Sequence, residues 1–290
     1  MQDINKITAL AVGYNSREVL ANSLSPFYGR MDIVVVDNAS SDGSVAFLKQ
    51  EFPDIDIVEN QRNLGYGAGF NTGLARVKTP YILAFSPDSV FSVEKLEQLY
   101  GFAEKFDNAA MTCPALHVPG HGDEIWVMGP GEMNHGKASF EGDGPFCSWF
   151  SSGAVCLYRT EMLRAIGGFD ENIFLYNEDL DLCMRLRRAG YGIVIIPGIT
   201  ATHFNSGSAP PSVKLHWRKD WNFAWGHLYV TNKFWGRRAM LGSAVKLISI
   251  RGPKSLFYAL TINRKRFIRD FALTLGALAF LLGRRPNPKS

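Results

Sequence analysis

The sequence predicts an α/β protein whose central sheet is mostly parallel and carries helices on both faces. Short apolar runs without polar alternation recur along the N-terminal third of the chain, as expected for strands buried on both faces. Each run is followed by a polar turn and then by apolar residues at helical spacing, which is the alternation of a parallel sheet. With 290 residues, 46% hydrophobic and 20% charged, the chain can form one large globular domain or two small ones.

The predicted elements follow one another in a regular order. Four apolar runs predict buried strands, at residues 7–12, 33–36, 55–58 and 81–85. A helical pattern follows each strand, and Ser92 is suited to cap the fourth helix, which we expect to end at Phe106. Residues 107–150 are predicted as strands and loops with a flap rich in Gly and Pro, anchored by aromatic residues that include Trp126 and Phe140. Two further strands are predicted, at residues 150–158 and 192–196.

Polar side chains follow each of the first four strands at the point where the strand ends. In chain order they are Tyr14 with Asn15, then Asp37, then Asn63 with Gly65, then Asp88. Each cluster alone fits an ordinary turn, because Asn, Asp, Ser and Gly are turn formers. The carboxyl ends of parallel strands meet at one edge of the sheet, however, and ligands bind there in this class of fold. The four clusters together therefore predict a nucleotide site.

The glycine-rich stretch at residues 65–73 excludes two common kinds of phosphate loop. It does not match the G-x-x-x-x-G-K-[ST] pattern of a P-loop. It also follows the third strand rather than the first, so it fits poorly with a dinucleotide-binding fingerprint. The small residues at the start of the 150–158 strand, among them Gly153, would let a ligand approach the backbone closely.

An unusual concentration of acids lies between residues 167 and 191, before and within a predicted helix. Five acidic residues fall within twelve positions: Asp170, Glu171, Glu178, Asp179 and Asp181. Carboxylates at a helix start are favoured by the helix dipole and the free N–H groups, which explains one or two of them. A carboxylate on a rigid helix start beside aromatic residues also suits a general base. Both interpretations, structural and catalytic, stay open at this point.

His203 and the four cysteines are further candidates among the reactive side chains. A histidine taken alone has a structural role by default, but His203 together with Asp88 could hold a divalent cation. The cysteines form neither close pairs nor a metal-ligand spacing: they are Cys113, Cys147, Cys156 and Cys183. We expect each of them to fill an apolar position in a reducing compartment, and the N-terminal residues show no secretory signal.

The ordered succession of these segments resembles the family-2 inverting glycosyltransferases, and in particular their bacterial rhamnosyltransferase-like branch. The motifs are VGYN, VVDNASSDGS, NLGYGAGFNTGL, SPDS, GGFDE and YNEDLDLCMRLRRAG, followed by His203. The likeness covers residues 5–235, and the order of the motifs is more specific than any one of them. It implies a GT-A type nucleotide-sugar-binding fold and an inverting sugar transfer by single displacement.

The resemblance also implies roles for the residues that bind the donor. Tyr14, Asn15, Asp37 and Asn63 would contact the nucleotide, with Asp37 on the pyrimidine, and Gly65 and Gly153 belong to the same donor site. Asp88 matches the last acid of the family's D-x-D metal motif, which would hold Mg²⁺ or Mn²⁺ against the diphosphate. Ser86 occupies the first position of that motif, so one anionic ligand is missing.

The remaining carried-over roles concern the chemistry. His203 matches a position that can help to hold the metal or the diphosphate. Asp179 matches the catalytic base, which would deprotonate the acceptor hydroxyl while a cation stabilises the departing diphosphate. Glu178 is expected to orient or to support the site, and Asp181 is a rival for the base.

The C-terminal part of the chain is strongly basic. Residues 233–290 hold thirteen of the 31 Lys and Arg residues but only one of the 27 acids. Their net charge is therefore +12, and that of the preceding residues is −8. The uncharged run at 271–283 is too short to span a bilayer, but with its basic flanks it fits a helix lying on an anionic leaflet. Packing on the catalytic domain and an oligomer contact are the alternatives.

Residues 216–229 show a helical stripe that belongs to the same region. The stripe consists of Trp217, Trp221 and Trp225, for which core packing is the default interpretation. Other faces of this helix carry side chains that could meet an acceptor phosphate: Arg218, Lys219 and His227. No nucleic-acid recognition motif is present. We therefore expect a catalytic domain at 1–232 and a basic amphipathic helical membrane-association segment at 233–290.

These observations lead to a functional expectation with one main alternative. We expect a cytoplasmic glycosyltransferase, peripheral on the inner face of the cell membrane, that uses a dTDP- or UDP-sugar in bacterial cell-surface glycan synthesis. The donor would be dTDP-L-rhamnose and the acceptor a lipid-linked saccharide or polysaccharide. The alternative, motivated by Ser86, is a non-catalytic nucleotide-sugar-binding scaffold subunit of a glycan assembly complex. A sugar-phosphate nucleotidyltransferase ranks lower, because the glycine-rich segment near the N-terminus of that class is absent.

Overall fold

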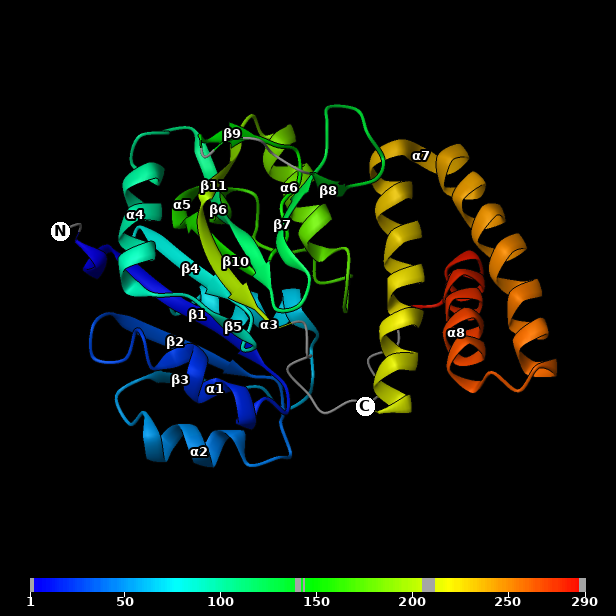
Figure 1. The fold of residues 1–290 in the computed structure, drawn as a ribbon, viewed down its shortest axis with the longest axis horizontal. Helices are drawn as coiled ribbons and strands as arrows, with labels where there is room; N and C mark the ends of the chain where they lie inside the picture. The colour runs from blue at the N-terminus through cyan, green and yellow to red at the C-terminus, as the bar shows by residue number, and fades with distance from the viewer. Residues whose placement is uncertain (1–2, 139–141, 143, 205–211, 287–290) are drawn as a thin grey trace.

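The computed structural model describes residues 3–138, 142, 144–204 and 212–286, and shows an α/β layer beside a layer of long helices (Figure 1). The strands are β1 (Ile7–Gly13), β2 (Asp32–Asp37), β3 (Asp56–Glu59), β4 (Tyr81–Phe85), β5 (Ser89–Val90), β6 (Ala109–Val118), β7 (Gly122–Val127), β8 (Gly136–Ala138), β9 (Phe146–Cys147), β10 (Val155–Arg159) and β11 (Gly192–His203). The helices are α1 (Arg17–Leu24), α2 (Ser44–Glu51), α3 (Tyr66–Leu74), α4 (Val93–Ala103), α5 (Thr160–Ala165), α6 (Glu178–Arg188), α7 (Val213–Leu260) and α8 (Arg264–Leu281).

The central sheet confirms the predicted class. Its strands run in the order β3-β2-β1-β4-β10-β6-β11-β5, and the four predicted N-terminal strands are parallel neighbours. β10 is antiparallel to both of its neighbours, β4 and β6, so the sheet becomes mixed beyond β4. The strand expected at 150–158 is shorter than expected, because pairing begins only at Val155 and the preceding residues form a loop at the sheet edge.

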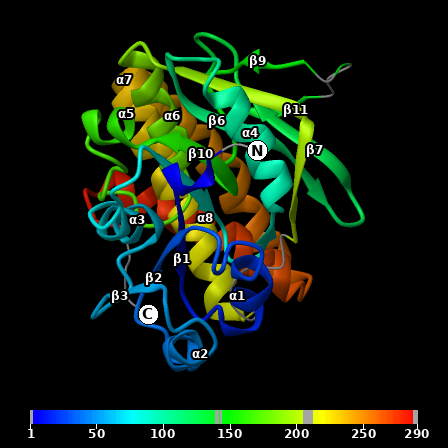
Figure 2. The same ribbon diagram turned by 90° about the vertical axis from the view of Figure 1, so that its left-hand side faces the viewer.

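Helices cover both faces of the sheet, as the sequence predicts (Figure 2). Residues of β1 alternate between the faces, since successive side chains of a strand point in opposite directions. Ala9 and Ala11 pack in a core with Leu20 of α1 and Leu96 of α4. The intervening β1 residues pack in a second core with α3, α5 and α6, which includes Phe70. Ser92 accepts a hydrogen bond from the amide of Lys95 (3.3 Å) and so caps α4 as expected.

The region between β6 and β10 forms the expected flap. β7 pairs with β6 on one side and with the short β8 on the other, which extends the sheet past its edge. Trp126 packs against the second core from β7, whereas the expected anchor Phe140 lies outside the described residues. Three cysteines are buried, but Cys147 on β9 is exposed, so the expectation that all four fill apolar positions is wrong for this one.

The C-terminal helices form a second layer. Helical geometry in α7 is interrupted at Gly236 (φ 84°, ψ 174°), where the helix changes direction, and α8 lies between its two halves (Figure 1). The domain boundary expected at 232/233 falls inside α7, just before this break. Among the described residues, no helix has both the length and the apolarity needed to cross a membrane.

The tryptophan stripe of α7 packs as its default interpretation predicts. Trp217 lies edge-on to Phe271 with ring centroids 5.7 Å apart, and Trp225 lies edge-on to Phe280 at 5.4 Å. A Cβ at Gly276 would lie 2.2 Å from the carbonyl oxygen of Trp221, so α8 approaches the α7 backbone as closely as only glycine permits. The apolar run of residues 271–283 therefore packs on α7, which is one of the alternatives that the sequence left open.

Candidate active site

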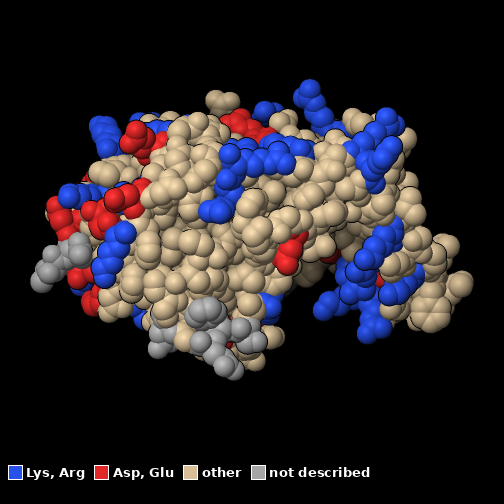
Figure 3. Space-filling model, turned by 90° about the horizontal axis from the view of Figure 1, so that it is seen from above, with Lys and Arg blue, Asp and Glu red and all other residues tan. Residues whose placement is uncertain are grey.

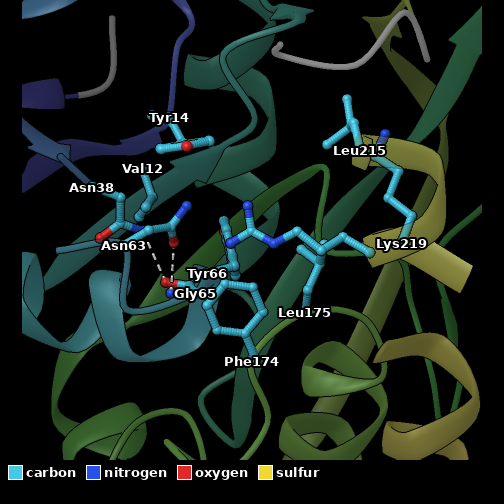
Figure 4. A pocket seen from close by; sticks show the side chains of 12 residues that line it. Val12, Tyr14, Asn38, Asn63, Gly65, Tyr66, Phe174, Leu175, Leu215 and Lys219 are labelled. Atoms are coloured by element: carbon cyan, nitrogen blue, oxygen red, sulfur yellow. Dashed lines mark hydrogen bonds between the residues drawn. The ribbon is translucent and has the colours of Figure 1, made fainter. Parts of the chain in front are cut away.

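A cavity of about 130 Å³ lies beyond the carboxyl ends of β1 and β2 (Figure 4). Tyr14 after β1, and Asn63 with Gly65 after β3, contribute to its wall as the sequence predicts. Phe174, which precedes α6, faces them. The opposite wall comes from α7, through Leu215, Arg218 and Lys219. Two of the four predicted sheet-edge clusters thus meet at this cavity, which we call the inner compartment, whereas Asp37 and Asp88 do not line it.

Hydrogen bonds hold the loop that forms the floor of the inner compartment. Asn38, which the sequence analysis did not single out, donates from Nδ2 to the carbonyl oxygen of Gly65 (2.9 Å). Asn63 accepts a hydrogen bond from the Gly65 amide (2.9 Å). Gly65 has a φ of 87°, and a Cβ there would lie 2.1 Å from the carbonyl oxygen of Phe174. Only glycine fits this position, so Gly65 supports the compartment through its backbone.

Asn15 and Asp37 support the loop that follows β2. The amide of Asn15 donates to Ser40 Oγ (2.8 Å), and its side-chain oxygen accepts from the Ser41 amide (2.8 Å). Asp37 is buried and accepts a hydrogen bond from the Ser40 amide (2.9 Å). Asn15 adopts a positive φ of 53°, which Asn tolerates better than most residues. Both predicted residues therefore order this loop from the ends of β1 and β2.

The α7 side of the compartment is cationic. The guanidinium of Arg218 lies 5.1 Å from the ring centroid of Phe174 and 6.0 Å from that of Tyr14, and the residue is only 8% exposed. Lys219 lines the inner compartment and also the neighbouring cavity. A cationic wall against aromatic rings suits an anionic ligand with a planar base.

A second cavity, of about 330 Å³, adjoins the first and shares Val12, Tyr66, Leu175 and Lys219 with it. We call it the outer compartment. Five further predicted residues line it: Asp88, Gly153, Glu178, Asp179 and His203. The two compartments adjoin and together extend from the ends of β1 and β3 to the start of α6.

Asp88 and His203 meet in space, as a shared cation site requires. β11 pairs antiparallel with β5, which sets His203 opposite Ser89. His203 Nε2 consequently lies 3.4 Å from Asp88 Oδ1, and both side chains are largely buried. This contact was the condition under which the sequence analysis gave His203 a role at a cation.

The donor atoms at this place fit a divalent cation that takes its other ligands from a substrate. Among the described residues no three His, Cys, Asp or Glu side chains gather as a metal site. Mg²⁺ is commonly bound by one or two carboxylates, with substrate phosphates and water completing its shell. Asp88 supplies such a carboxylate, His203 a neighbouring nitrogen, and Ser86 a hydroxyl on the same turn.

Asp179 and Glu178 begin α6 at the wall of the outer compartment. Asp179 accepts a hydrogen bond from the amide of Leu180 (2.8 Å), and its Cβ lies 3.6 Å from the place where a side chain at Gly153 would begin. Burial raises the pKa of Asp179, although the charge of His135 and the amide hydrogen bonds partly oppose this shift. A carboxylate whose pKa is raised accepts a proton more readily, which suits a general base.

The turn before α6 is strained and is held by α7. Tyr176 and Asn177 both have left-handed backbones, with φ of 65° and 68°. Strain of this kind persists where the surrounding structure imposes it, often at functional sites. Asn177 donates to the carbonyl oxygen of Phe223 (3.2 Å), and a Cβ at Gly226 would lie 2.8 Å from the Tyr176 carbonyl oxygen. Close packing of α7 on this turn therefore sets the position of Asp179.

His135, which sequence reasoning did not single out, influences the electrostatics of Asp179. It lies in the flap before β8 and stacks on Phe150, with ring centroids 4.0 Å apart and planes at 12°. Burial lowers the pKa of His135, and the charge of Asp179 acts in the opposite direction. The flap has no hydrophobic periodicity, so no local pattern in the sequence connects His135 with α6.

Asp181, the rival candidate for the base, lies elsewhere. It is completely buried and forms ion pairs with Arg185 Nε (2.6 Å) and Lys233 Nζ (2.5 Å). Lys233 also pairs with Asp170 (2.6 Å), so the network joins α6, α7 and the turn before α6. These contacts bury Asp181 in an ion-pair network, whereas Asp179 and Glu178 are the acids of α6 that line the outer compartment.

Glu178 leads to a prediction about stability and pH. Burial, and then the charge of Asp179, raise the pKa of Glu178 from 4.5 to about 8. The folded protein therefore binds this proton more tightly than the unfolded chain, and stability falls as the pH rises from about 4.5 to about 8. We expect Glu178→Gln to remove this decline and to stabilise the protein at alkaline pH by on the order of 3 kcal/mol. Urea unfolding of both proteins at about pH 5 and about pH 9 measures the difference, and equal slopes with pH would contradict it.

The fold and this two-compartment site, in which an aromatic and cationic pocket adjoins a group of acids, fit a glycosyltransferase. The family model of glycosyl transferase family 2 matches residues 14–167, which is more than half of the chain. The chain belongs to this family, as its motifs predict.

Relatives and solved structures agree with this assignment. N-acetylglucosaminyl-diphospho-decaprenol L-rhamnosyltransferase of Mycobacterium tuberculosis is 23% identical over 209 residues, which cover 61% of this chain and 68% of the relative. The mannosyltransferase PcManGT of Pyrobaculum calidifontis, solved with GDP-Man and Mn²⁺, superposes with a TM-score of 0.58 at 13% identity, over 97% of this chain and 88% of that one. GalNAc-T7, solved with UDP, GalNAc and Mn²⁺, gives a TM-score of 0.58 at 12% identity over 76% of this chain, which spans 47% of that chain. These similarities confirm the GT-A type of fold.

Proposed function

We propose that this protein transfers a sugar from a nucleotide donor to an acceptor hydroxyl with inversion at the anomeric carbon. The donor we propose is dTDP-L-rhamnose. The motifs resemble the rhamnosyltransferase-like branch, and a relative is named as an L-rhamnosyltransferase. The acceptor is a lipid-linked saccharide or a polysaccharide under construction for the bacterial cell surface. The site of action is the cytoplasmic face of the cell membrane.

One observation carries this proposal: the inner and outer compartments adjoin through shared lining residues and can divide the roles that such a transfer needs. The inner compartment offers aromatic rings and the cationic α7 wall to a nucleotide, with Asp37 and Asn15 ordering the adjacent loop. The outer compartment places the Asp88–His203 pair and Asp179 around one space. A nucleotide-sugar lying across both would bring its diphosphate to Asp88 and its sugar toward α6.

Asp88 and His203 act at the leaving group. Bound Mg²⁺ or Mn²⁺ would neutralise charge on the departing diphosphate. Asp88 would hold that cation by its carboxylate, and His203 lies close enough to share it or to donate to a phosphate oxygen. Lys219, which lines both compartments, adds a further positive charge between them.

Asp179 acts at the attacking group. Its carboxylate takes the proton of the acceptor hydroxyl while the oxygen attacks the anomeric carbon, and the bond from that carbon to the diphosphate oxygen breaks. Glu178, with its raised pKa, stays protonated at neutral pH and spares Asp179 a second neighbouring charge. No covalent sugar–enzyme bond is needed in a single displacement.

Nucleotide binding tests the donor half of the proposal. We expect calorimetry to show binding of dTDP that strengthens in Mg²⁺ or Mn²⁺, with UDP as the comparison nucleotide. Asp88→Ala should lose the metal-dependent gain, about tenfold or more in affinity, and keep the metal-independent part. An Asp123→Ala variant is the matched control, because this acid is exposed on β7 and pairs with His117 away from the cavities.

The result separates the proposal from its alternatives. If neither dTDP nor UDP binds, the transferase mechanism at this site is overturned. Metal-dependent binding without transfer to any acceptor would favour the non-catalytic scaffold subunit. Metal-dependent binding that Asp88→Ala leaves unchanged would place the cation elsewhere.

A further inference from the structure

The turn between α7 and α8 exposes a group of large apolar side chains at the end of the molecule farthest from the N-terminus (Figure 1). Leu256, Phe257, Leu260 and Ile262 are exposed by 68%, 58%, 84% and 88%. We call these four residues the apolar tip. Single exposed apolar residues are ordinary, but a contiguous group at a projecting turn marks an interaction surface.

The apolar tip is ordered rather than frayed. The amide of Asn263 donates to the carbonyl oxygen of Tyr258 (2.9 Å), and Asn263 Oδ1 accepts from the amide of Arg266 (3.3 Å), which caps α8. Ile262 has a φ of 54°, a left-handed backbone that a β-branched residue rarely adopts. The chain therefore maintains both a strained backbone and exposed apolar side chains at this turn, which suggests a function for it.

Basic residues surround the apolar tip without any acid. Residues 252–268 include Lys254, Arg264, Lys265 and Arg266 and no Asp or Glu, and all four basic residues are exposed. The acid nearest to this segment in the sequence, Asp270, is buried and already paired with Arg251 (3.1 Å) and Arg269 (2.9 Å). Figure 3 shows Lys and Arg side chains gathered at this end of the molecule beside an uncharged projection.

The chemistry of this surface selects among possible partners. A second copy of the chain would bring two sets of four like charges together, which opposes self-association through the tip. Nucleic acid would gain from the charge but not from four exposed aliphatic and aromatic side chains. An anionic bilayer matches both features, since its headgroups attract Lys and Arg while its acyl boundary takes up apolar side chains.

We infer that the α7–α8 turn docks the protein on an anionic membrane surface, with the apolar tip inserted at the acyl boundary and its basic neighbours on the headgroups. This inference deepens, and rests on, the membrane location proposed above. It moves the main attachment element from the run at 271–283, which packs on α7 through Phe271 and Gly276, to the turn that precedes it.

Vesicle flotation of the full chain tests the inference. Wild type should bind vesicles of phosphatidylcholine mixed with phosphatidylglycerol, bind phosphatidylcholine alone much more weakly, and dissociate as salt rises. Leu260→Ser combined with Ile262→Asn should weaken binding about tenfold or more, because two apolar side chains no longer leave water. The matched control is Leu241→Ser with Val245→Asn, two exposed apolar residues of α7 away from the turn, which should keep wild-type binding.

A second pair of variants separates charge from apolar insertion. Arg264→Gln with Lys265→Gln should weaken binding to anionic vesicles about tenfold and flatten its salt dependence. The control pair, Arg237→Gln with Arg238→Gln, removes the same amount of charge beside Gly236. It should weaken binding to anionic vesicles less than the Arg264 and Lys265 pair does. Circular dichroism of every variant should be unchanged, since all the substituted side chains are substantially exposed.

Three outcomes would overturn the inference. Wild type could fail to bind anionic vesicles, control and tip variants could lose binding equally, or the tip substitutions could dissolve a dimer that forms without vesicles. Nucleotide binding by calorimetry on the same variants is independent of the membrane. Vesicle binding without nucleotide binding would defeat the proposed function and leave membrane docking standing, whereas the reverse would defeat docking alone.

Discussion

Asp179→Asn should abolish sugar transfer and leave the fold intact. The amide keeps the size of the side chain and its hydrogen bond from Leu180, but it cannot take the acceptor proton. General-base catalysis contributes 10²–10⁴-fold in typical enzymes, so we expect kcat to fall about 10³-fold with little change in donor affinity. Product formation from the sugar nucleotide, with nucleotide affinity by calorimetry, measures both quantities.

Glu178→Gln is the matched control for this result. Glu178 is the neighbouring acid on the same turn of α6, and its pKa of about 8 keeps it protonated at neutral pH. Glutamine resembles the protonated acid, so kcat should stay within about tenfold of wild type. An Asp179→Asn enzyme that retained this level of turnover would remove Asp179 as the base.

The second large effect concerns stability. Asp181→Asn should destabilise the protein by about 3–5 kcal/mol, because it leaves Arg185 and Lys233 without their buried carboxylate. Turnover per folded molecule should change much less than in Asp179→Asn. Urea unfolding gives the stability, and activity normalised to the folded fraction gives the catalytic effect.

Asp170→Asn provides a graded comparison in the same network. Asp170 shares Lys233 but is less deeply buried than Asp181, so its replacement should cost less stability. A well-folded Asp181→Asn protein without turnover would reverse the assignment and make Asp181 the base.

The contrast between Asp179 and Asp181 shows where sequence reasoning reaches its limit. Both acids lie in the first turn of one helix, and spacing alone does not separate them. Their difference arises from Lys233, which is distant in sequence and pairs with Asp181. His135 was missed for a related reason, since a flap without periodicity carries no local signal of the helix it faces.

Other features of the molecule could be predicted from the pattern of residues. The apolar runs predicted the parallel strands because β1, β2 and β4 are buried on both faces, whereas β3, which is also parallel, is an edge strand with half-buried and exposed residues. The Asp88–His203 contact could be anticipated only as a condition, since it depends on the β5–β11 pairing. The role of the run at 271–283 remained ambiguous, because an apolar helix face has the same sequence pattern whether it contacts a bilayer or α7.

The packing of α8 has a consequence for how the molecule is made. Trp217, Trp221 and Trp225 of α7 are covered by α8, and Trp225 also donates from Nε1 to the carbonyl oxygen of Arg284 (2.8 Å). During synthesis the N-terminal parts emerge first and begin to fold before the rest exists. The tryptophan face of α7 therefore stays uncovered until residues 264–284 have left the ribosome, and the α7 residues that press on the turn before α6, Phe223 and Gly226, belong to the same helix. Maturation of the acidic end of the active site is accordingly a late event in the life of the nascent chain.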